Sequence, residues 1–461
     1  MADHMRHPAS YKDPSGFIFQ ASGKFYRQVN KIYAVHYDLL IRSGLSSFLQ
    51  EKKLLLPHEE VTENILHSDD WYLTLLPEQL PFTSYPYEWC FEQLKDAALL
   101  TLEIVKLSID KGMILKDATP YNIQFLNGRP VFIDTLSFEK YDPSLPWIAY
   151  RQFCESFLFP LLLSHYHKTS IQPYLTSYLN GIPVNIIAKL LPWKSRFNHG
   201  VWLHVFLQNK LSKKTNDSIP ANSFNKNKLF NLISHLDGII RNLNNSDKTE
   251  WSNYYAESIS SQEYLAKKEE IISNLLQKLN GRKLLDLGAN EGFFSLLAAT
   301  KNFDVVAIDK DDQCINNLYK KIKDEKITNL LPLCLDLMNP SPASGFANNE
   351  RASFGERIHT DAVMALALIH HLAIGYNLPL NKIAEYLYGF SHQLIIEFVP
   401  KEDEKVQVLL QNKKDIYPDY TREHFENIFR QRFTITEKVQ VPGSNRIIYL
   451  MKRLAETGKS S

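Results

Sequence analysis

Short apolar runs alternate with helical patterns through the C-terminal half of the 461-residue chain. Nearly continuous apolar strands separated by helices are typical of a parallel sheet covered on both faces. Two further strand patterns joined by PGSN (442–445) predict an antiparallel pair at the end. We therefore predict a doubly wound, Rossmann-like α/β domain whose seven-stranded sheet has an antiparallel last strand. The strands are expected at 283–288, 304–309, 330–336, 361–368, 393–399, 433–441 and 446–453.

The N-terminal half has a less regular pattern. It begins with short strand patterns within 14–35, continues with a long helical pattern over 89–112 and then a hairpin with its turn at Asn127–Gly128, and is mostly helical over 147–210. We predict an α+β domain. Polar stretches on either side of a short helical segment read as a linker. The expected division is 1–210 for the accessory domain, 211–250 for the linker and 251–461 for the second domain.

The composition narrows the class of protein. Lys plus Arg number 52 and Asp plus Glu 51, so the net charge of +1 gives no general attraction to nucleic acid, and a nucleic-acid partner is not expected. The longest apolar runs, such as FLFPLLL (157–163), are too short for a membrane span. The N-terminus has no apolar signal segment, and the four cysteines and 15 histidines show no metal-ligand spacing. We expect a cytoplasmic protein without a bound metal.

The most informative segment is LLDLGANEGFFS (284–295), a strand followed by a turn and a helix. Gly288 and Gly292 in the turn let the backbone approach a ligand closely, and the following helix offers free N–H groups. A dinucleotide fingerprint would need glycines where Asn290 and Phe293 stand. The spacing therefore excludes the usual pyrophosphate loop.

The same turn meets the pattern D-x-G-x-(G/N)-x-G and resembles motif I of the class I S-adenosylmethionine-dependent methyltransferases. The resemblance implies S-adenosylmethionine as the cofactor. It further implies that Asp309, at the end of the second strand, binds the ribose and that Asp336, after the third, binds the adenine. The residues that would cradle the methionine part are Asp286, Gly288, Asn290 and Gly292.

Several longer phrases are similar to one bacterial methyltransferase family that includes host-specific nodulation proteins of rhizobia. They are KDATPYNIQF (116–125), VFIDTLSFE (131–139), ALALIHHLAI (365–374) and DIYPDYT (415–421). The resemblance covers nearly the whole chain and implies methyl transfer. It suggests a small molecule or a saccharide as the acceptor, and leaves the oligomeric state open.

The residues that follow strands four and five are expected to face the methyl group. His370 and His371 are candidate bases because imidazole titrates near neutral pH, and Glu397 is a candidate for binding an acceptor amine or hydroxyl. The structural alternative for the histidines is that they cap the helix after strand four or that one of them lies in the core. The alternative for Glu397 is a buried carboxylate at a strand end. The long connection 337–360 is predicted to close over the cofactor or acceptor, with a surface loop containing one short helix as the alternative.

The first domain has a faint kinase-like pattern. Asp117 precedes Asn122 by five residues, and Asp134 follows twelve residues later, a spacing similar to that of kinases and aminoglycoside-type phosphotransferases. A kinase-type glycine-rich loop is missing, and Lys24 or Arg27 are distant candidates for the cation. The alternative is an ordinary hairpin in which these residues serve turns.

Three functions follow from these patterns. The first is S-adenosylmethionine-dependent methyl transfer, with the N-terminal domain binding the acceptor or packing against the methyltransferase. The second is a bifunctional phosphotransferase and methyltransferase. The third is a non-catalytic binding or effector protein that keeps the cofactor fold.

Overall fold

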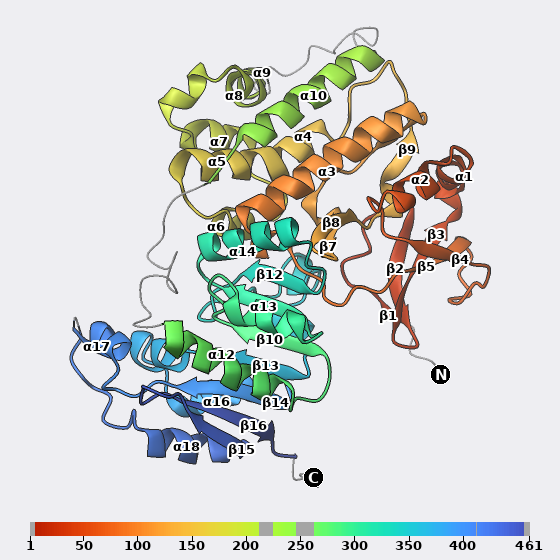
Figure 1. Ribbon diagram of the computed structural model, residues 1–461. Helices are drawn as coiled ribbons and strands as arrows, with labels where there is room; N and C mark the ends of the chain where they lie inside the picture. The colour runs from red at the N-terminus through yellow and green to blue at the C-terminus, as the bar shows by residue number, and fades with distance from the viewer. Residues whose placement is uncertain (1–4, 212–224, 246–261, 412, 456–461) are drawn as a thin grey trace. The chain divides into compact units, whose positions relative to one another are not determined.

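The computed structural model describes residues 5–211, 225–245, 262–411 and 413–455 (Figure 1). The chain folds into two compact units, Met1–Asp247 with Ala343–Ala352, and Lys248–Pro342 with Ser353–Ser461. Helix α10 (Lys226–Asn242), which falls in the expected linker, belongs to the first unit. The remaining linker residues 212–224 and 246–250 lie outside the described residues.

The first unit begins with a five-stranded antiparallel sheet in the order β1-β2-β3-β5-β4. Helices α1 (Ala34–Arg42) and α2 (Leu45–Glu51) connect β3 to β4, and Tyr33 and Tyr37 pack with strand residues in one buried cluster. The strands are β1 (Met5–Arg6), β2 (Gly16–Ala21), β3 (Lys24–Asn30), β4 (His58–Val61) and β5 (Trp71–Pro77).

A long helix, α3 (Phe91–Asp110), forms the centre of the rest of the first unit, and apolar residues at helical spacing are buried along it. A hairpin follows, with its turn at Asn127–Gly128 as predicted. Both turn residues have positive φ, 54° and 74°, which is the conformation that an Asn-Gly turn adopts. The short strands are β6 (Met113–Leu115), β7 (Ile123–Leu126), β8 (Arg129–Phe132) and β9 (Phe138–Lys140).

Helices complete the first unit, in agreement with the predicted α+β class. The α-helices are α4 (Tyr150–Phe153), α5 (Phe159–His167), α6 (Gln172–Ser177), α7 (Val184–Leu190), α8 (His199–Val201), α9 (Gln208–Leu211) and α10. Two π-helical turns interrupt them at Cys154–Leu158 and Trp202–Leu207. Single 3-10 turns lie at Lys31–Tyr33, Pro86–Glu88, Pro120–Asn122, Thr135–Ser137 and Trp193–Phe197.

The first unit also includes Ala343–Ala352, which lies between β12 and β13 in sequence. Tyr11 Oη and Lys12 Nζ donate to the buried carboxylate of Glu350 at 2.5 and 2.7 Å, and the Arg351 guanidinium lies 4.0 Å from the Tyr121 ring centre. Burial alone would raise the pKa of Glu350, but the hydrogen bonds from Lys12 and Tyr11 lower it to about 2. These contacts hold the middle of the connection that was expected to act as a lid.

The second unit contains the predicted seven-stranded sheet, in the order β12-β11-β10-β13-β14-β16-β15. Strands β10 to β14 pair in parallel, and β16 runs antiparallel to both of its neighbours. Every residue of β13 and β14 is buried, as expected for strands covered on both faces. The strands are β10 (Lys283–Leu287), β11 (Asp304–Asp309), β12 (Leu330–Cys334), β13 (Ala362–Ala365), β14 (Gln393–Phe398), β15 (Phe433–Gln440) and β16 (Ile447–Arg453).

Helices alternate with these strands. One apolar cluster joins α12, α13 and α14 to the sheet through residues such as Leu275, Phe294 and Leu318. The α-helices are α12 (Gln262–Leu276), α13 (Phe293–Thr300), α14 (Asp312–Glu325), α15 (Phe354–Arg357), α16 (Leu380–Tyr388), α17 (Glu404–Leu410) and α18 (Arg422–Arg430). A π-helical turn covers His371–Gly375, and a 3-10 turn covers Phe346–Asn348 within the segment that counts with the first unit.

The turn before α13 yields a prediction about stability. Gly292 has φ of 77°, and a Cβ there would lie 2.5 Å from the Leu318 side chain, so Gly292→Ala adds a clash to backbone strain. We expect a loss of about 3 kcal/mol in the free energy of unfolding. Urea unfolding followed by circular dichroism measures the loss, and hydrogen exchange of β10 assigns it to the second unit.

Gly443→Ala is the matched control. Gly443 has nearly the same φ, 79°, but a Cβ there would have nothing within 4 Å. We expect only the backbone cost of about 1 kcal/mol. Equal losses in the two variants would contradict the clash with Leu318.

Candidate active site

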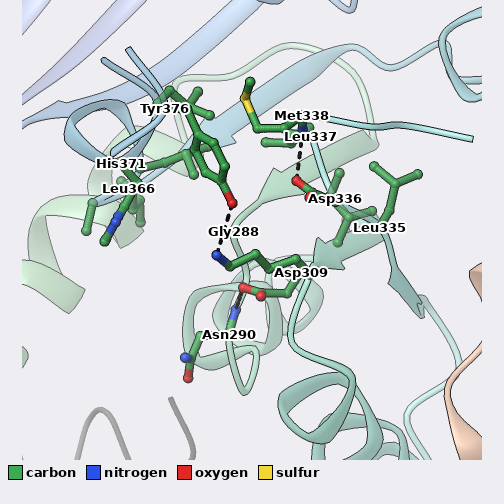
Figure 2. A pocket seen from close by; sticks show the side chains of 15 residues that line it. Gly288, Asn290, Asp309, Leu335, Asp336, Leu337, Met338, Leu366, His371 and Tyr376 are labelled. Carbon is green, nitrogen blue, oxygen red and sulfur yellow. Dashed lines mark hydrogen bonds between the residues drawn. The ribbon is translucent and has the colours of Figure 1, made fainter. Parts of the chain in front are cut away.

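A cavity of about 130 Å³ lies where the strands β10 to β13 of the second unit end (Figure 2). Carboxyl ends of parallel strands meet at one edge of a sheet, and this edge is where open α/β sheets bind ligands. We call this the first cavity. Its lining comes from the turn after β10, the ends of β11 and β12, and the segment after β13. The lining residues include Gly288, Asn290, Asp309, Lys310, Leu335, Asp336, Met338, Leu366, Ala367, His371 and Tyr376.

The glycine turn forms one wall of the first cavity. Gly288 has φ of 73°, and a Cβ at this position would lie 3.2 Å from Leu368, so the backbone itself faces the space. Asn290 also has positive φ, 52°, and its N–H donates to Asp309 Oδ2 at 2.8 Å. The turn is thereby tied to the end of the next strand. Gly292 lines neither cavity and instead begins α13 in the left-handed conformation.

Two carboxylates at neighbouring strand ends face the first cavity. Asp309 accepts N–H groups from Asn290 and Asp311, and burial raises its pKa. Asp336 accepts the Met338 N–H at 2.9 Å (Figure 2). The two carboxylates offer hydrogen-bond acceptors to a ligand in the cavity. The apolar side chain of Met338, which also lines the cavity, offers a surface on which a flat ring can pack.

Lys310 and Tyr376 add a polar pair that the sequence patterns did not single out. Lys310 Nζ donates to Tyr376 Oη at 3.2 Å and lies 5.5 Å from the ring centre. Both residues line the first cavity, and Tyr376 is labelled in Figure 2. Tyr376 follows the π-helical turn, so its position depends on a helix type that residue spacing does not reveal.

A second cavity of about 310 Å³ adjoins the first. The two share Gly288, Leu366 and Ala367 as lining residues. The other walls come from α12, from the end of β10 and the start of α13, from the segment that leads from β14 into α17, and from the connection between β15 and β16. Residues that line the second cavity include Tyr264, Lys268, Asp286, Phe294, Pro400, Glu402, Asp403, Glu404, Lys405, Ser444, Asn445 and Arg446.

Buried charges hold the walls of the second cavity together. Lys268 Nζ lies 2.6 Å from Glu397 Oε2, with side chains 6% and 0% exposed. Arg446 binds Asp403 through two hydrogen bonds of 2.7 and 2.9 Å, and its Nη1 lies 3.7 Å from Glu397 Oε1. Burial lowers the pKa of Lys268, and the charge of Glu397 acts against that effect. Paired in this way, four charges are accommodated although their side chains are at most 15% exposed.

Ala367 is one of the three residues that line both cavities, and its backbone is strained. Its φ is 48°, a conformation that a residue with a Cβ rarely adopts. The Ala367 N–H donates to Glu397 Oε2 at 2.8 Å, the same oxygen that Lys268 contacts. The buried carboxylate therefore fixes a strained residue between the cavities, a kind of strain that clusters at functional sites.

The three predicted catalytic residues are placed differently from one another. His371 lines the first cavity, and burial, followed by the charge of Lys310, lowers its pKa to about 4. His370 is 1% exposed and lines neither cavity, and its ring nitrogens have no hydrogen-bond partner among the described residues. Glu397 also lies behind the lining and acts on it through Lys268 and Ala367.

Asp286, at the end of β10, lines the second cavity rather than the first. Burial, assisted by the charge of Asp309, raises its pKa to about 7, although Ser295 Oγ donates to its carboxylate at 2.5 Å. Both of its protonation states are thus accessible near neutral pH.

The kinase-like positions come together in the first unit. Arg27 of β3 pairs with Asp134, Ser137 Oγ donates to the other oxygen of Asp134, and Asn122 Nδ2 donates to Ser137 Oγ at 3.2 Å. Asp117 Oδ1 is buried without a hydrogen-bond partner in the described structure, and burial raises the pKa of that carboxyl. Of the two cations considered, Arg27 is the one that reaches Asp134.

Over the residues that the structure describes, no three His, Cys, Asp or Glu side chains form a group that could hold a metal ion. Within the same residues, none of the helices combines the length and the apolar character that crossing a bilayer requires.

Comparison with known proteins identifies the family. The model of a family described as "Tellurite resistance protein TehB" matches residues 248–343. The chain is 32% identical over 459 residues to the nodulation protein NoeA of Rhizobium meliloti (strain 1021), covering 96% of this chain and 95% of that protein. The chain belongs to the NoeA family. The predicted similarity to rhizobial nodulation proteins is confirmed, and the NoeA relationship spans both units.

Solved structures match part of this NoeA-family chain. The N-methyltransferase NodS from Bradyrhizobium japonicum WM9 is 12% identical, with a TM-score of 0.33 over 43% of this chain and all of that one. The bifunctional kinase-methyltransferase WbdD is 17% identical, with a TM-score of 0.31 over 44% of this chain and 41% of that one. The strand order itself, with the last strand lying between β14 and β15, is that of the class I methyltransferase fold.

The Lys268–Glu397 pair yields a prediction. Lys268→Met leaves a buried carboxylate without its main cation, and we expect the free energy of unfolding to fall by about 4 kcal/mol. Adding Glu397→Gln removes the charge and keeps an oxygen for the Ala367 N–H, so the double variant should lose only about 2 kcal/mol. Urea unfolding of the full chain measures both losses.

Lys267→Met is the control for this pair. Lys267 is the sequence neighbour of Lys268, but it pairs with Glu263 on the surface, with side chains 41% and 74% exposed. We expect this change to leave the free energy of unfolding nearly the same. A double variant less stable than Lys268→Met alone would contradict the importance of the buried charge.

Proposed function

We propose that the second unit transfers a methyl group from S-adenosylmethionine to a small-molecule acceptor. The observation that carries the proposal is the first cavity, where a glycine turn faces two strand-end carboxylates, Asp309 and Asp336. Membership of the NoeA family supports a nodulation-related small molecule or saccharide as the acceptor. The cysteines are free and buried in the structure, which supports a cytoplasmic setting.

The residues present fit this cofactor. The turn at Gly288 and Asn290 leaves space that a Cβ would narrow, and with Asp286 it would hold the methionine part. Asp309 would accept hydrogen bonds from the ribose hydroxyls and Asp336 from the adenine amino group. When bound, the cofactor supplies a methyl group on a positively charged sulfur, which becomes a neutral thioether once an acceptor lone pair takes the methyl carbon.

The chain's own residues would position the acceptor and take up its proton. His371 is neutral at pH 7 because its pKa is about 4, so it can accept a hydrogen bond from a hydroxyl acceptor. As a weak base it would take the proton only when the acceptor oxygen becomes positively charged on methylation. Leu366 and Ala367 form the shared wall between the cavities and keep water from the reacting atoms. Glu397 and Lys268 act as positioning residues, since they hold Ala367 in place.

Removal of Asp309 tests the cofactor site. We expect Asp309→Ala to weaken S-adenosylmethionine binding by about 100-fold or more, because two hydrogen bonds to a carboxylate are lost. Isothermal titration calorimetry of the purified full chain measures the affinity. Asp304→Ala, at the exposed start of the same strand, should bind as the unchanged protein does. Absence of binding to the unchanged protein would favour the effector alternative.

The pH dependence of binding provides a second test. Below its pKa of about 7 Asp286 is protonated and neutral, and above it the carboxylate attracts the ammonium group of the cofactor's methionine part. Affinity for S-adenosylmethionine should therefore rise up to about tenfold between pH 6 and pH 8. Asp286→Asn should retain only the pH dependence that comes from the cofactor's own amine. The same slope in both proteins would rule out this role for Asp286.

Phosphotransfer in the first unit is the second candidate, favoured by the buried Asp117 that lies near Asn122 and Asp134. The arrangement does not fit a magnesium site, because Arg27 and Ser137 already occupy the oxygens of Asp134. Calorimetric titration with ATP and magnesium tests this candidate, and binding that is lost in Asp134→Ala would support it.

A further inference from the structure

The second cavity adjoins the place where methyl transfer would occur. Gly288, Leu366 and Ala367 line both cavities, so a molecule in the second cavity would reach the wall of the first. This inference rests on the proposed function, in which the cofactor occupies the first cavity and its methionine part reaches Asp286 on the adjoining wall of the second. The walls contributed by α12 and by the β15–β16 connection are not used by any cofactor role assigned above.

The cations deep in the second cavity are already neutralised. Lys268 pairs with Glu397, and the bidentate contact of Arg446 occupies Asp403. Both cations donate hydrogen bonds to carboxylates of the protein, so an incoming anion would have to compete with these contacts. The deep part of the cavity therefore offers no uncompensated positive charge.

The rim of the cavity carries excess negative charge. Glu402 and Glu404 are exposed and have no ion-pair partner among the described residues. Lys405 is the single cation beside them in the 400–405 part of the lining. Two carboxylates against one ammonium give a negative local potential that attracts cations and repels anions.

We propose that the part of the second cavity between the 400–405 segment and the β15–β16 connection is the acceptor site. We propose that it selects an uncharged or cationic acceptor bearing hydroxyl or amine groups over one bearing phosphate or carboxylate. Glu402 and Glu404 are the specificity-determining residues, and Arg446 positions the segment that carries them through Asp403. The acceptor atom is then an oxygen or nitrogen that donates a hydrogen bond before it is methylated.

Three probes that share one sugar ring test the charge preference. Glucosamine, glucose and glucose 6-phosphate are titrated into the full chain saturated with S-adenosylhomocysteine, and binding is followed by saturation-transfer difference NMR. We expect affinity to decrease in that order. The difference between the first and the last probe should shrink as salt is raised, because exposed charges are screened.

The double variant Glu402→Gln with Glu404→Gln links the preference to the rim. It should reduce the glucosamine preference about fivefold and keep the affinity for S-adenosylhomocysteine. Glu423→Gln, an exposed acid on α18, is the matched control and should change neither.

The outcomes separate the two proposals. Failure of S-adenosylhomocysteine to bind would overturn the proposed function. Three outcomes would overturn the acceptor-class proposal alone, provided that S-adenosylhomocysteine still binds. They are binding of glucose 6-phosphate as tight as or tighter than that of glucosamine, no binding of any probe, and an unchanged preference in the double variant.

Discussion

A single carboxylate without solvent exposure, that of Glu397, organises the candidate active site. One of its oxygens receives both the Lys268 ammonium and the Ala367 N–H, and Arg446 approaches the other. A charge buried in this way is tolerated only while its partners stay in place. The helix before β10, the segment after β13 and the β15–β16 connection are therefore joined at one point of the sheet's carboxyl edge.

The sequence predicts the framework of this site because the framework depends on local patterns. Apolar runs with helices between them specify the parallel sheet, and an antiparallel strand at the end is what a short turn between two strand patterns requires. The glycine turn is equally local, since Gly288 and Asn290 need positive φ wherever they lie. The sequence also predicts that Asp309 and Asp336 lie at the same edge of the sheet, because the neighbouring parallel strands that they follow end there.

The partners of the charged residues are not predictable in the same way. Lys268 and Glu397 are 129 positions apart, and their helix and strand patterns give no sign that the two meet. The sequence alone does not show which of the neighbours His370 and His371 faces the cavity. The π-helical turn that begins at His371 determines that His371 lines it. Arg27 and Asp134 likewise meet only because β3 of one sheet lies against the hairpin region. Tertiary packing, not local preference, determines these contacts.

The segment Ala343–Ala352 has a consequence for how such a chain can evolve. In sequence its residues lie between β12 and β13, two strands of the second unit's sheet. The Glu350 carboxylate, however, binds Tyr11 and Lys12 of the first unit. A gene cut once between the units would leave the first unit without Glu350 and the second with an unpartnered loop. The two units are therefore not interchangeable modules, and recombination at a single junction would not transmit either one whole.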